Sequence, residues 1–227
     1  MSNDISPADQ QLIDATAAHV RALHGQDTTG HDWWHIHRVW RNAQLIAAGE
    51  DVNRAVVELG ALLHDIADWK FSAGDIHAGG RAARAWLERS GARPELVDAV
   101  VEIVDNVSYK GAGVPDRMAS PEGRVVQDAD RLDALGAVGI GRAFAYGGAA
   151  GRPMYDPERE PELHASADAY MNARSDTIGH FHEKLLLLHD RMHTGTARRI
   201  ARRRHDYMVQ FLERFHTEWN GLDGPDA

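Results

Sequence analysis

The sequence predicts an all-α protein, and three observations support this fold class. Apolar residues recur with the 3.6-residue period of a helix rather than the two-residue period of a strand. Helix boundary signals flank these stretches, such as Ser6 followed by Pro7 and the capping residue Asp32. The short β-branched pairs Val100-Val101 and Val125-Val126 lie within helical surroundings and do not predict strands.

Each expected helix combines an apolar face with a start or stop signal. Pro94 and Pro121 each suit the first turn of a helix, and Gly25 and Gly91 each suit a helix end. Between Gly147 and Pro161, glycine, proline and charged residues cluster, which predicts a loop, with a lid as the alternative. The expected helices run from Ser6 to Gly25, from Asp32 through Ile46, from about Asn53 to His64, from about Ile76 to Ser90, from Pro94 through Val104, from Pro121 with a continuation or restart near Asp130, through Phe181 and Leu188, and from Ile200 through Trp219.

Length and composition predict one domain. The chain has 227 residues, of which 43% are apolar, enough for one packed core. We expect a single all-helical domain over residues 1–227. Its motifs would lie at about residues 30–150, and the C-terminal helices at residues 160–220 would pack on that core.

Charge and cysteine content narrow the function classes. There are no cysteines, which excludes disulfides, thiolate metal sites and cysteine nucleophiles. The net charge is −9, and the basic stretch from Arg198 to Arg204 is interpreted as a solvated helix face, so no nucleic-acid polymer is expected as a partner. No signal peptide and no run long enough to span a bilayer is visible, so we expect a cytoplasmic protein without a membrane partner.

The pair His64-Asp65 is the strongest sign of chemistry. It follows the apolar run Leu59 to Leu63, where an unsatisfied imidazole and carboxylate would be costly to bury. A divalent cation would satisfy both, and imidazole with carboxylate suits Mn, Fe, Co, Ni or Zn better than Mg or Ca. The pairs His31-Asp32, His189-Asp190 and His205-Asp206 lack this context.

Four longer stretches resemble one known family. They read GHDWWHIHRVWRNA from Gly30, ALLHDIADWKF from Ala61, VSYKG from Val107 and VVQDADRLDALGAVGIGRAFAYGG from Val125. Together they resemble the HD-domain superfamily of metal-dependent phosphohydrolases, and more narrowly its bacterial YpgQ/YedJ-type subgroup. The resemblance implies an HD-domain helical bundle that binds one divalent metal ion. Manganese is expected, with Mg, Co, Ni, Fe or Zn as alternatives, and the implied ligands are His35, His64, Asp65 and Asp130.

Two of these ligands have rivals nearby. The superfamily histidine stands three residues before the Arg-Val pair, which favours His35 over His37. Asp128 is the alternative to Asp130. Some members hold a second metal through further histidines, but His77 is the only histidine between the HD pair and Asp130, which favours one metal.

Further residues are candidates for catalysis and phosphate binding. Asp68 follows His64 by four residues and would share its side of a continued helix, where it can orient a water molecule or accept its proton. Lys70 is expected to assist catalysis, whereas Lys110, Arg38 and Arg131 are expected to bind phosphate. The alternative for Asp68 is an exposed carboxylate without a catalytic role. The alternative for each of the four basic residues is a surface salt bridge. Trp33, Trp34 and Trp69 are expected in the core, with stacking on a base or sugar as the alternative.

The resemblance implies hydrolysis of nucleoside triphosphates to the monophosphate and pyrophosphate. One alternative is a phosphomonoesterase that acts on nucleoside monophosphates or small phosphate esters. Another is a non-catalytic sensor that binds metal and nucleotide. The expected partner is a small-molecule nucleotide or another phosphate ester, and a homodimer is compatible with the sequence.

Overall fold

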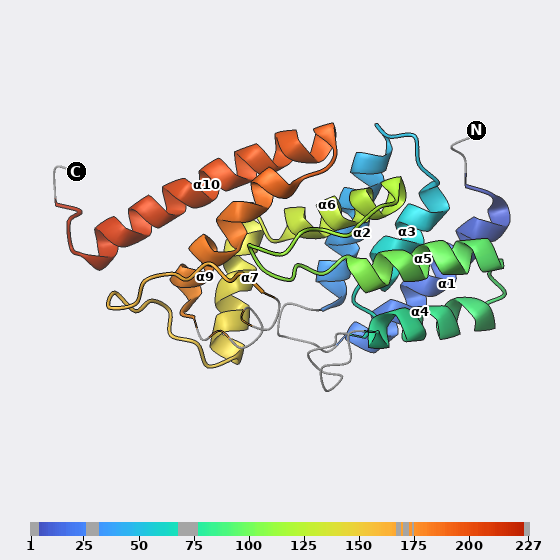
Figure 1. The fold of residues 1–227 in the computed structure, drawn as a ribbon, viewed down its shortest axis with the longest axis horizontal. Helices are drawn as coiled ribbons and strands as arrows, with labels where there is room; N and C mark the ends of the chain where they lie inside the picture. The colour runs from blue at the N-terminus through green and yellow to red at the C-terminus, as the bar shows by residue number, and fades with distance from the viewer. Residues whose placement is uncertain are drawn as a thin grey trace. The chain divides into compact units, whose positions relative to one another are not determined.

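The computed structural model describes residues 5–25, 32–67, 77–166, 169, 173 and 175–224. The chain divides into two compact units (Figure 1). Unit 1 comprises Met1–Tyr109 and Pro115–Arg131, and unit 2 comprises Lys110–Val114 and Leu132–Ala227. The elements in the described residues are all helical, which confirms the predicted fold class. That the C-terminal helices pack on the motif core as one domain stays a prediction.

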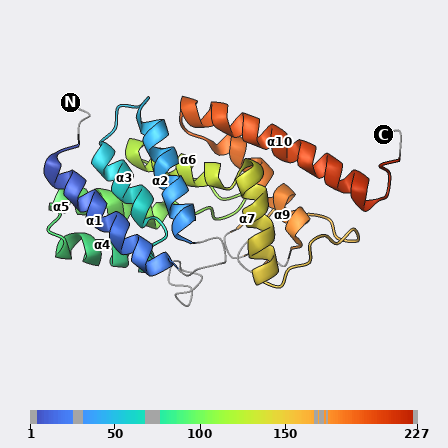
Figure 2. The ribbon, with the colours of Figure 1, turned by 180° about the vertical axis from the view of Figure 1, so that it is seen from behind.

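Unit 1 is built around one buried helix. Every residue of α3 from Ala55 to Leu63 is buried, and α3 packs against α1, α2 and α5, while α4 packs against α5 (Figures 1 and 2). Burial on all sides explains why this segment is apolar at nearly every position instead of on one face. The helices of this unit are α1 (Pro7–His24), α2 (Trp33–Ala47), α3 (Arg54–Leu63), α4 (Ala78–Arg89), α5 (Pro94–Asn106) and α6 (Pro121–Asp133), the last of which continues two residues into unit 2.

Local capping sets the helix starts that the sequence predicted. The side chain of Ser6 accepts a hydrogen bond from the backbone N–H of Asp9, and Asn53 accepts from the first turn of α3. Each side chain satisfies N–H groups that have no partner within the helix. At the end of α4, Gly91 has φ of 76°, a left-handed conformation that favours glycine.

One buried carboxylate joins α2 to α3. Glu58 is 3% exposed, and its Oε2 accepts hydrogen bonds from Trp40 Nε1 at 2.9 Å and Gln44 Nε2 at 2.8 Å. Two donors compensate for the desolvation of the carboxylate. The interaction fixes α2 against α3, the two helices that supply the histidines of the site described below.

Unit 2 contains α7 (Gly136–Ala149), α9 (Thr177–Glu183), the 3₁₀ helix η2 (Leu185–Arg191) and α10 (Gly195–Trp219). α10 packs against α7 and η2. Phe144, Phe181 and Phe211 form an aromatic cluster with ring centroids 5.9 to 6.2 Å apart. These rings join α7, α9 and α10 within this unit.

The sequence left open whether the helix from Pro121 continues or restarts near Asp130, and the structure shows a break between α6 and α7; it also predicted one helix where α9 and η2 lie. Several glycines of α7 have a packing reason. A Cβ at Gly139 would lie 2.2 Å from the carbonyl oxygen of Ala134, and one at Gly147 would lie 2.3 Å from Thr177 Oγ1. Lys184, with φ of −139°, separates α9 from η2.

The predicted loop between Gly147 and Pro161 is largely confirmed, since helix α7 ends at Ala149 and no helix follows before residue 161. Within unit 2, the loop carbonyls of Pro153 and Met154 accept hydrogen bonds from Thr177 and Ile178 at the start of α9. A lid function for this loop stays a prediction.

None of the described helices is long and apolar enough to cross a membrane.

Candidate metal centre

His35 is held in the first turn of α2. Asp32 is the N-cap, as predicted, and its Oδ1 accepts a hydrogen bond from the backbone N–H of His35 at 2.9 Å. The side chain of His35 is 1% exposed. The cap therefore fixes the backbone of the residue whose imidazole points into unit 1.

Whereas His35 lies at the N-terminus of its helix, His64 lies at the C-terminus of α3, as the C-cap. Its Nδ1 lies 2.8 Å from the carbonyl oxygen of Ala61, one of the last carbonyls of the helix. A carbonyl only accepts hydrogen bonds, so Nδ1 carries a proton and donates it to this oxygen, while Nε2 on the other side of the ring faces the cluster. Metal-binding histidines are commonly oriented by such a bond.

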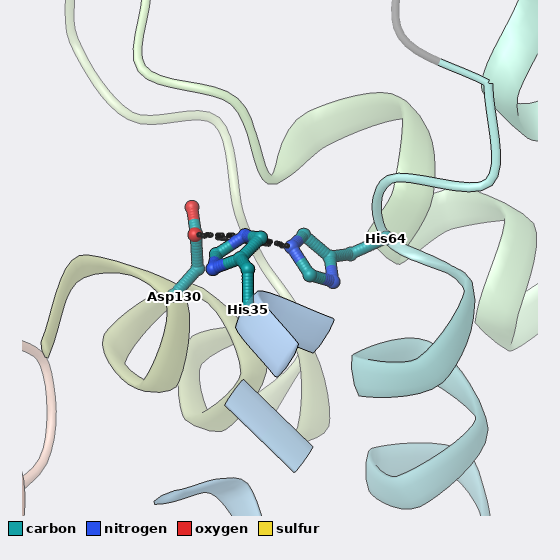
Figure 3. A group of neighbouring side chains, drawn as sticks. All are labelled: His35, His64 and Asp130. Carbon is teal, nitrogen blue, oxygen red and sulfur yellow. Dashed lines mark hydrogen bonds and ion pairs between the residues drawn. The ribbon is translucent and has the colours of Figure 1, made fainter. Parts of the chain in front are cut away.

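The two imidazoles and two carboxylates converge. His35 Nε2 lies 3.2 Å from His64 Nε2, 3.4 Å from Asp65 Oδ2 and 3.6 Å from Asp130 Oδ1. His64 Nε2 lies 3.6 Å from Asp65 Oδ2 and 3.8 Å from Asp130 Oδ1. Figure 3 shows His35, His64 and Asp130 pointing toward one another from α2, the end of α3 and α6. Folding thus brings together His35, the adjacent pair His64-Asp65, and Asp130, which are far apart along the sequence.

The separations fit a shared cation. Donors on one ion with bonds of about 2.1 Å lie roughly 3.0 Å apart in octahedral sites and 3.4 Å apart in tetrahedral sites. Among the described residues, His35, His64 and Asp130 form the group whose ligand atoms all lie within 4.8 Å of one another. A set of two nitrogen and two carboxylate donors suits a first-row transition metal, and Asp65 and Asp130 would neutralise its charge. The site also lies at the C-terminus of α3, where the helix dipole favours a cation.

Exposure gives the site an open side. The imidazoles are buried, whereas the side chains of Asp65 and Asp130 are 19% and 31% exposed. Solvent or a ligand therefore reaches the cluster past the two carboxylates.

The two alternatives to the predicted ligands, His37 and Asp128, have surroundings of a different kind. His37 packs beside the rings of Trp33, Trp34 and Trp40, and burial lowers its pKa, helped by the charges of Arg41, Arg38 and Arg21. Asp128 is fully buried. Neither belongs to the group of potential metal ligands in the described part of the chain.

The other His-Asp pairs take different places. Asp32 caps α2, while His31 lies outside the described residues. In unit 2, the rings of His189 and His205 lie 3.9 Å apart, and each faces its own neighbouring aspartate. No metal-ligand group includes them among the residues that the structure describes.

Arg131 was expected to bind phosphate, but it is 3% exposed and its Nη2 lies 2.6 Å from Asp116 Oδ1. One turn earlier on α6, Gln127 donates hydrogen bonds to the carbonyls of Asn106 and Val107 at 3.3 and 3.0 Å. Sequence reasoning missed Asp116 and Gln127, because neither a loop aspartate nor a helical glutamine carries a distinctive pattern. Phosphate binding by Arg131 stays a prediction, and its ion pair with Asp116 also gives it a positioning role.

The remaining predicted residues are distributed as follows. Arg38 is half-buried on α2, one turn after His35. Lys110 is half-buried and belongs to unit 2, where Arg191 donates to the carbonyls of Ala112 and Val114 in the same segment. Asp68, Lys70 and Trp69 lie outside the described residues. The roles of these residues stay predictions.

The two tryptophans at the start of α2 differ. Trp33 is 8% exposed and belongs to the core, as expected. Trp34 is 56% exposed, which contradicts the expectation that it packs in the core. The helix period separates the two tryptophans, because Trp33 lies three residues before buried Ile36 and shares its face, whereas Trp34 lies only two residues before it.

Comparison with known proteins identifies the family. Residues 33–135 match the HD domain family model. The Bacillus subtilis protein YpgQ is 36% identical over 205 residues, which cover 90% of this chain and 92% of YpgQ. The chain belongs to the HD-domain family.

Solved structures of other HD-domain proteins share the fold of this one. An HD-superfamily hydrolase from Bacillus thuringiensis is 42% identical with a TM-score of 0.71, over 93% of this chain and 98% of the hydrolase. A Lactobacillus plantarum protein is 31% identical with a TM-score of 0.83, over 96% of this chain and 100% of that one. YpgQ in complex with ADP is 32% identical with a TM-score of 0.70, over 93% of this chain and 100% of YpgQ. This HD-domain protein is thus a metal-dependent phosphohydrolase, as the sequence resemblance implied.

Proposed function

We propose that this HD-domain protein hydrolyses nucleoside triphosphates to the monophosphate and pyrophosphate with one divalent metal ion, for which Mn²⁺ is the expected species. The observation that supports it best is the convergence of the imidazole nitrogens of His35 and His64 with the carboxylates of Asp65 and Asp130. These four residues would hold the ion. A bound divalent ion lowers the pKa of a coordinated water and offsets charge on a phosphate.

Other roles in substrate binding and catalysis are assigned to acidic and basic side chains. Asp65 and Asp130 lie on the open side of the cluster, where their negative charge admits an anionic substrate only when a cation balances it. Asp68 is proposed to orient the attacking water and accept its proton. Arg38, Lys70 and Lys110 are proposed to neutralise the phosphate groups that leave.

Two observations support a nucleoside polyphosphate as the substrate. The related YpgQ was crystallised in complex with ADP. In addition, Arg21, Arg38 and Arg41 lie close enough to His37 to lower its pKa, which marks a locally positive surface in a chain of net charge −9. A polyphosphate is attracted to such a surface.

Product analysis tests the proposal. The purified protein is loaded with Mn²⁺ and incubated with a panel of ribo- and deoxyribonucleoside triphosphates, and the products are separated by ion-exchange chromatography. Nucleoside monophosphate and pyrophosphate in equal amounts are expected. Orthophosphate as the sole phosphorus product would favour the phosphomonoesterase. Stoichiometric metal without turnover of any phosphate ester would favour the sensor.

A further inference from the structure

Trp34 is placed unusually for a large apolar residue. It lies in the first turn of α2, beside the metal-ligand candidate His35, and 56% of it is exposed. Its neighbour Trp33 is almost fully buried, so α2 already has an aromatic anchor in the core. Trp34 therefore contributes little to packing, and its indole surface remains accessible to a ligand.

The indole is oriented by a ring contact. The centroids of Trp34 and His37 lie 5.9 Å apart with an interplanar angle of 79°, an edge-to-face arrangement. His37 in turn contacts Trp33 and Trp40, which are part of the same helix. This series of rings restricts the indole before any ligand arrives, which lowers the entropy cost of binding.

Arg38 stands between the metal-ligand candidate and the exposed indole. With about 100° per residue, Arg38 lies about 60° around the helix from His35 and about 40° from Trp34. Arg41, which is exposed, extends the same basic side one turn further. Going around α2, the buried metal-ligand candidate His35, the guanidinium of Arg38 and the exposed indole of Trp34 thus follow one another in this order.

We propose that Trp34 recognises the nucleobase: the indole stacks on the base of a nucleotide whose phosphate lies at the cluster of His35, His64, Asp65 and Asp130. The proposal rests on the proposed nucleotide substrate and names the residue that distinguishes it from other phosphate esters. A basic surface beside an exposed aromatic face fits an anion with a flat ring system, because a phosphate pairs with guanidinium groups while a base stacks on the indole.

Equilibrium binding of AMP and ribose 5-phosphate tests the proposal, because these two ligands differ only in the base. Isothermal titration calorimetry is carried out on the wild-type protein and on Trp34→Ala, Trp34→Phe and Leu45→Ala, all loaded with Mn²⁺. Leu45 is the matched control, since it lies on the same helix and is also 56% exposed. Circular dichroism checks that every variant is folded.

In the wild-type protein, AMP is expected to bind more tightly than ribose 5-phosphate. Trp34→Ala is expected to weaken AMP binding about tenfold, the scale of stacking between a base and an aromatic side chain. Ribose 5-phosphate binding is expected to stay unchanged, Trp34→Phe to recover most of the loss, and Leu45→Ala to behave like the wild type.

Three outcomes would overturn the proposal: equal binding of both ligands by the wild type, unchanged AMP binding in Trp34→Ala, or a parallel loss of both ligands in that variant. Turnover measured on the same wild-type sample separates this proposal from the proposed function. If the wild type releases pyrophosphate but Trp34→Ala binds AMP as tightly as the wild type, the base-stacking proposal is refuted and the proposed hydrolysis stands. Base-selective binding without any turnover supports base stacking and refutes the proposed hydrolysis.

Discussion

The buried guanidinium of Arg131 forms an ion pair with the partly exposed carboxylate of Asp116 beside the metal-ligand candidate Asp130, with 2.6 Å between the two groups. Gln127 lies one turn away on α6 and binds the carbonyls at the end of α5. Residues four apart share one side of a helix, so a single side of α6 holds both the end of α5 and Asp116. The pair therefore fixes the helix that carries Asp130.

Replacing Arg131 by Ala is expected to destabilise the protein. The change removes a buried guanidinium and its charge-assisted hydrogen bond to Asp116, which costs about 2 kcal/mol, and the free energy of unfolding from urea titration measures it. The double variant Arg131→Met with Asp116→Leu is expected to recover much of the loss. Wild-type stability of Arg131→Ala together with a raised KM for nucleotide would restore the phosphate-binding role predicted from the sequence.

Replacing His64 or Asp65 by Ala is expected to abolish both metal retention and hydrolysis. Each change removes one of the donors around His35 Nε2, and loss of a ligand weakens metal binding far more than the 10- to 100-fold typical of outer-shell partners. Metal content is measured by mass spectrometry after gel filtration. His189→Ala is the control, since it disrupts another His-Asp pair and is expected to keep its metal; full metal content in His64→Ala would refute the assignment.

Replacing Asp68 by Ala is expected to leave the metal bound but to slow turnover by about 100-fold, the usual effect of a lost acid or base. The rate is measured under saturating nucleotide together with metal content, and Asp68→Asn separates the loss of charge from the loss of the side chain. Normal rates in both variants would return Asp68 to the role of an exposed carboxylate.

Stability is expected to decrease below neutral pH partly through His19. Its ring stacks on Trp86 with centroids 3.7 Å apart, and burial, helped by the charge of Arg89, lowers the pKa of His19 below its ordinary value of 6.5. As the pH falls from 6.5 toward the lower pKa of the folded protein, the unfolded chain therefore binds more protons at His19 than the folded protein does. The contribution of His19 to the free energy of unfolding is thus fully present above pH 6.5 and is lost between these two pKa values.

Melting temperatures measured between about pH 8 and pH 5 test this effect. His19→Phe keeps an aromatic ring against Trp86 but cannot bind a proton, so its melting temperature is expected to fall less over the same interval. The comparison isolates His19 from other titrating groups. Identical pH dependence in the two proteins would exclude a contribution from His19.

Much of unit 1 could be predicted from the sequence because its signals are local. Ser6, Asp32 and Asn53 act through hydrogen bonds to residues two or three positions away, and the all-apolar α3 leaves few alternatives to a buried helix. The pair His64-Asp65 stood out for the same reason, since polar groups that follow a buried segment require compensation.

What could not be predicted depends on contacts between distant residues. The sequence left open whether a helix continues or restarts near Asp130, and the close approach of Ala134 and Thr177 to glycines of α7 depends on packing. The pairing of Arg131 with Asp116 likewise follows from packing and not from helix periodicity. The convergence of His35 with Asp130 was accessible only through resemblance to a family.

The acceptor that orients His64 is the main-chain oxygen of Ala61. Every amino acid at position 61 would offer the same oxygen, so no single side-chain replacement there deletes the bond that sets the tautomer. Mutational tolerance at position 61 is therefore governed by the volume available around it, while the imidazole keeps its orientation as long as the last turn of the helix keeps its shape. An insertion or deletion within that turn, rather than a point mutation, is the sequence change most apt to rotate the ring.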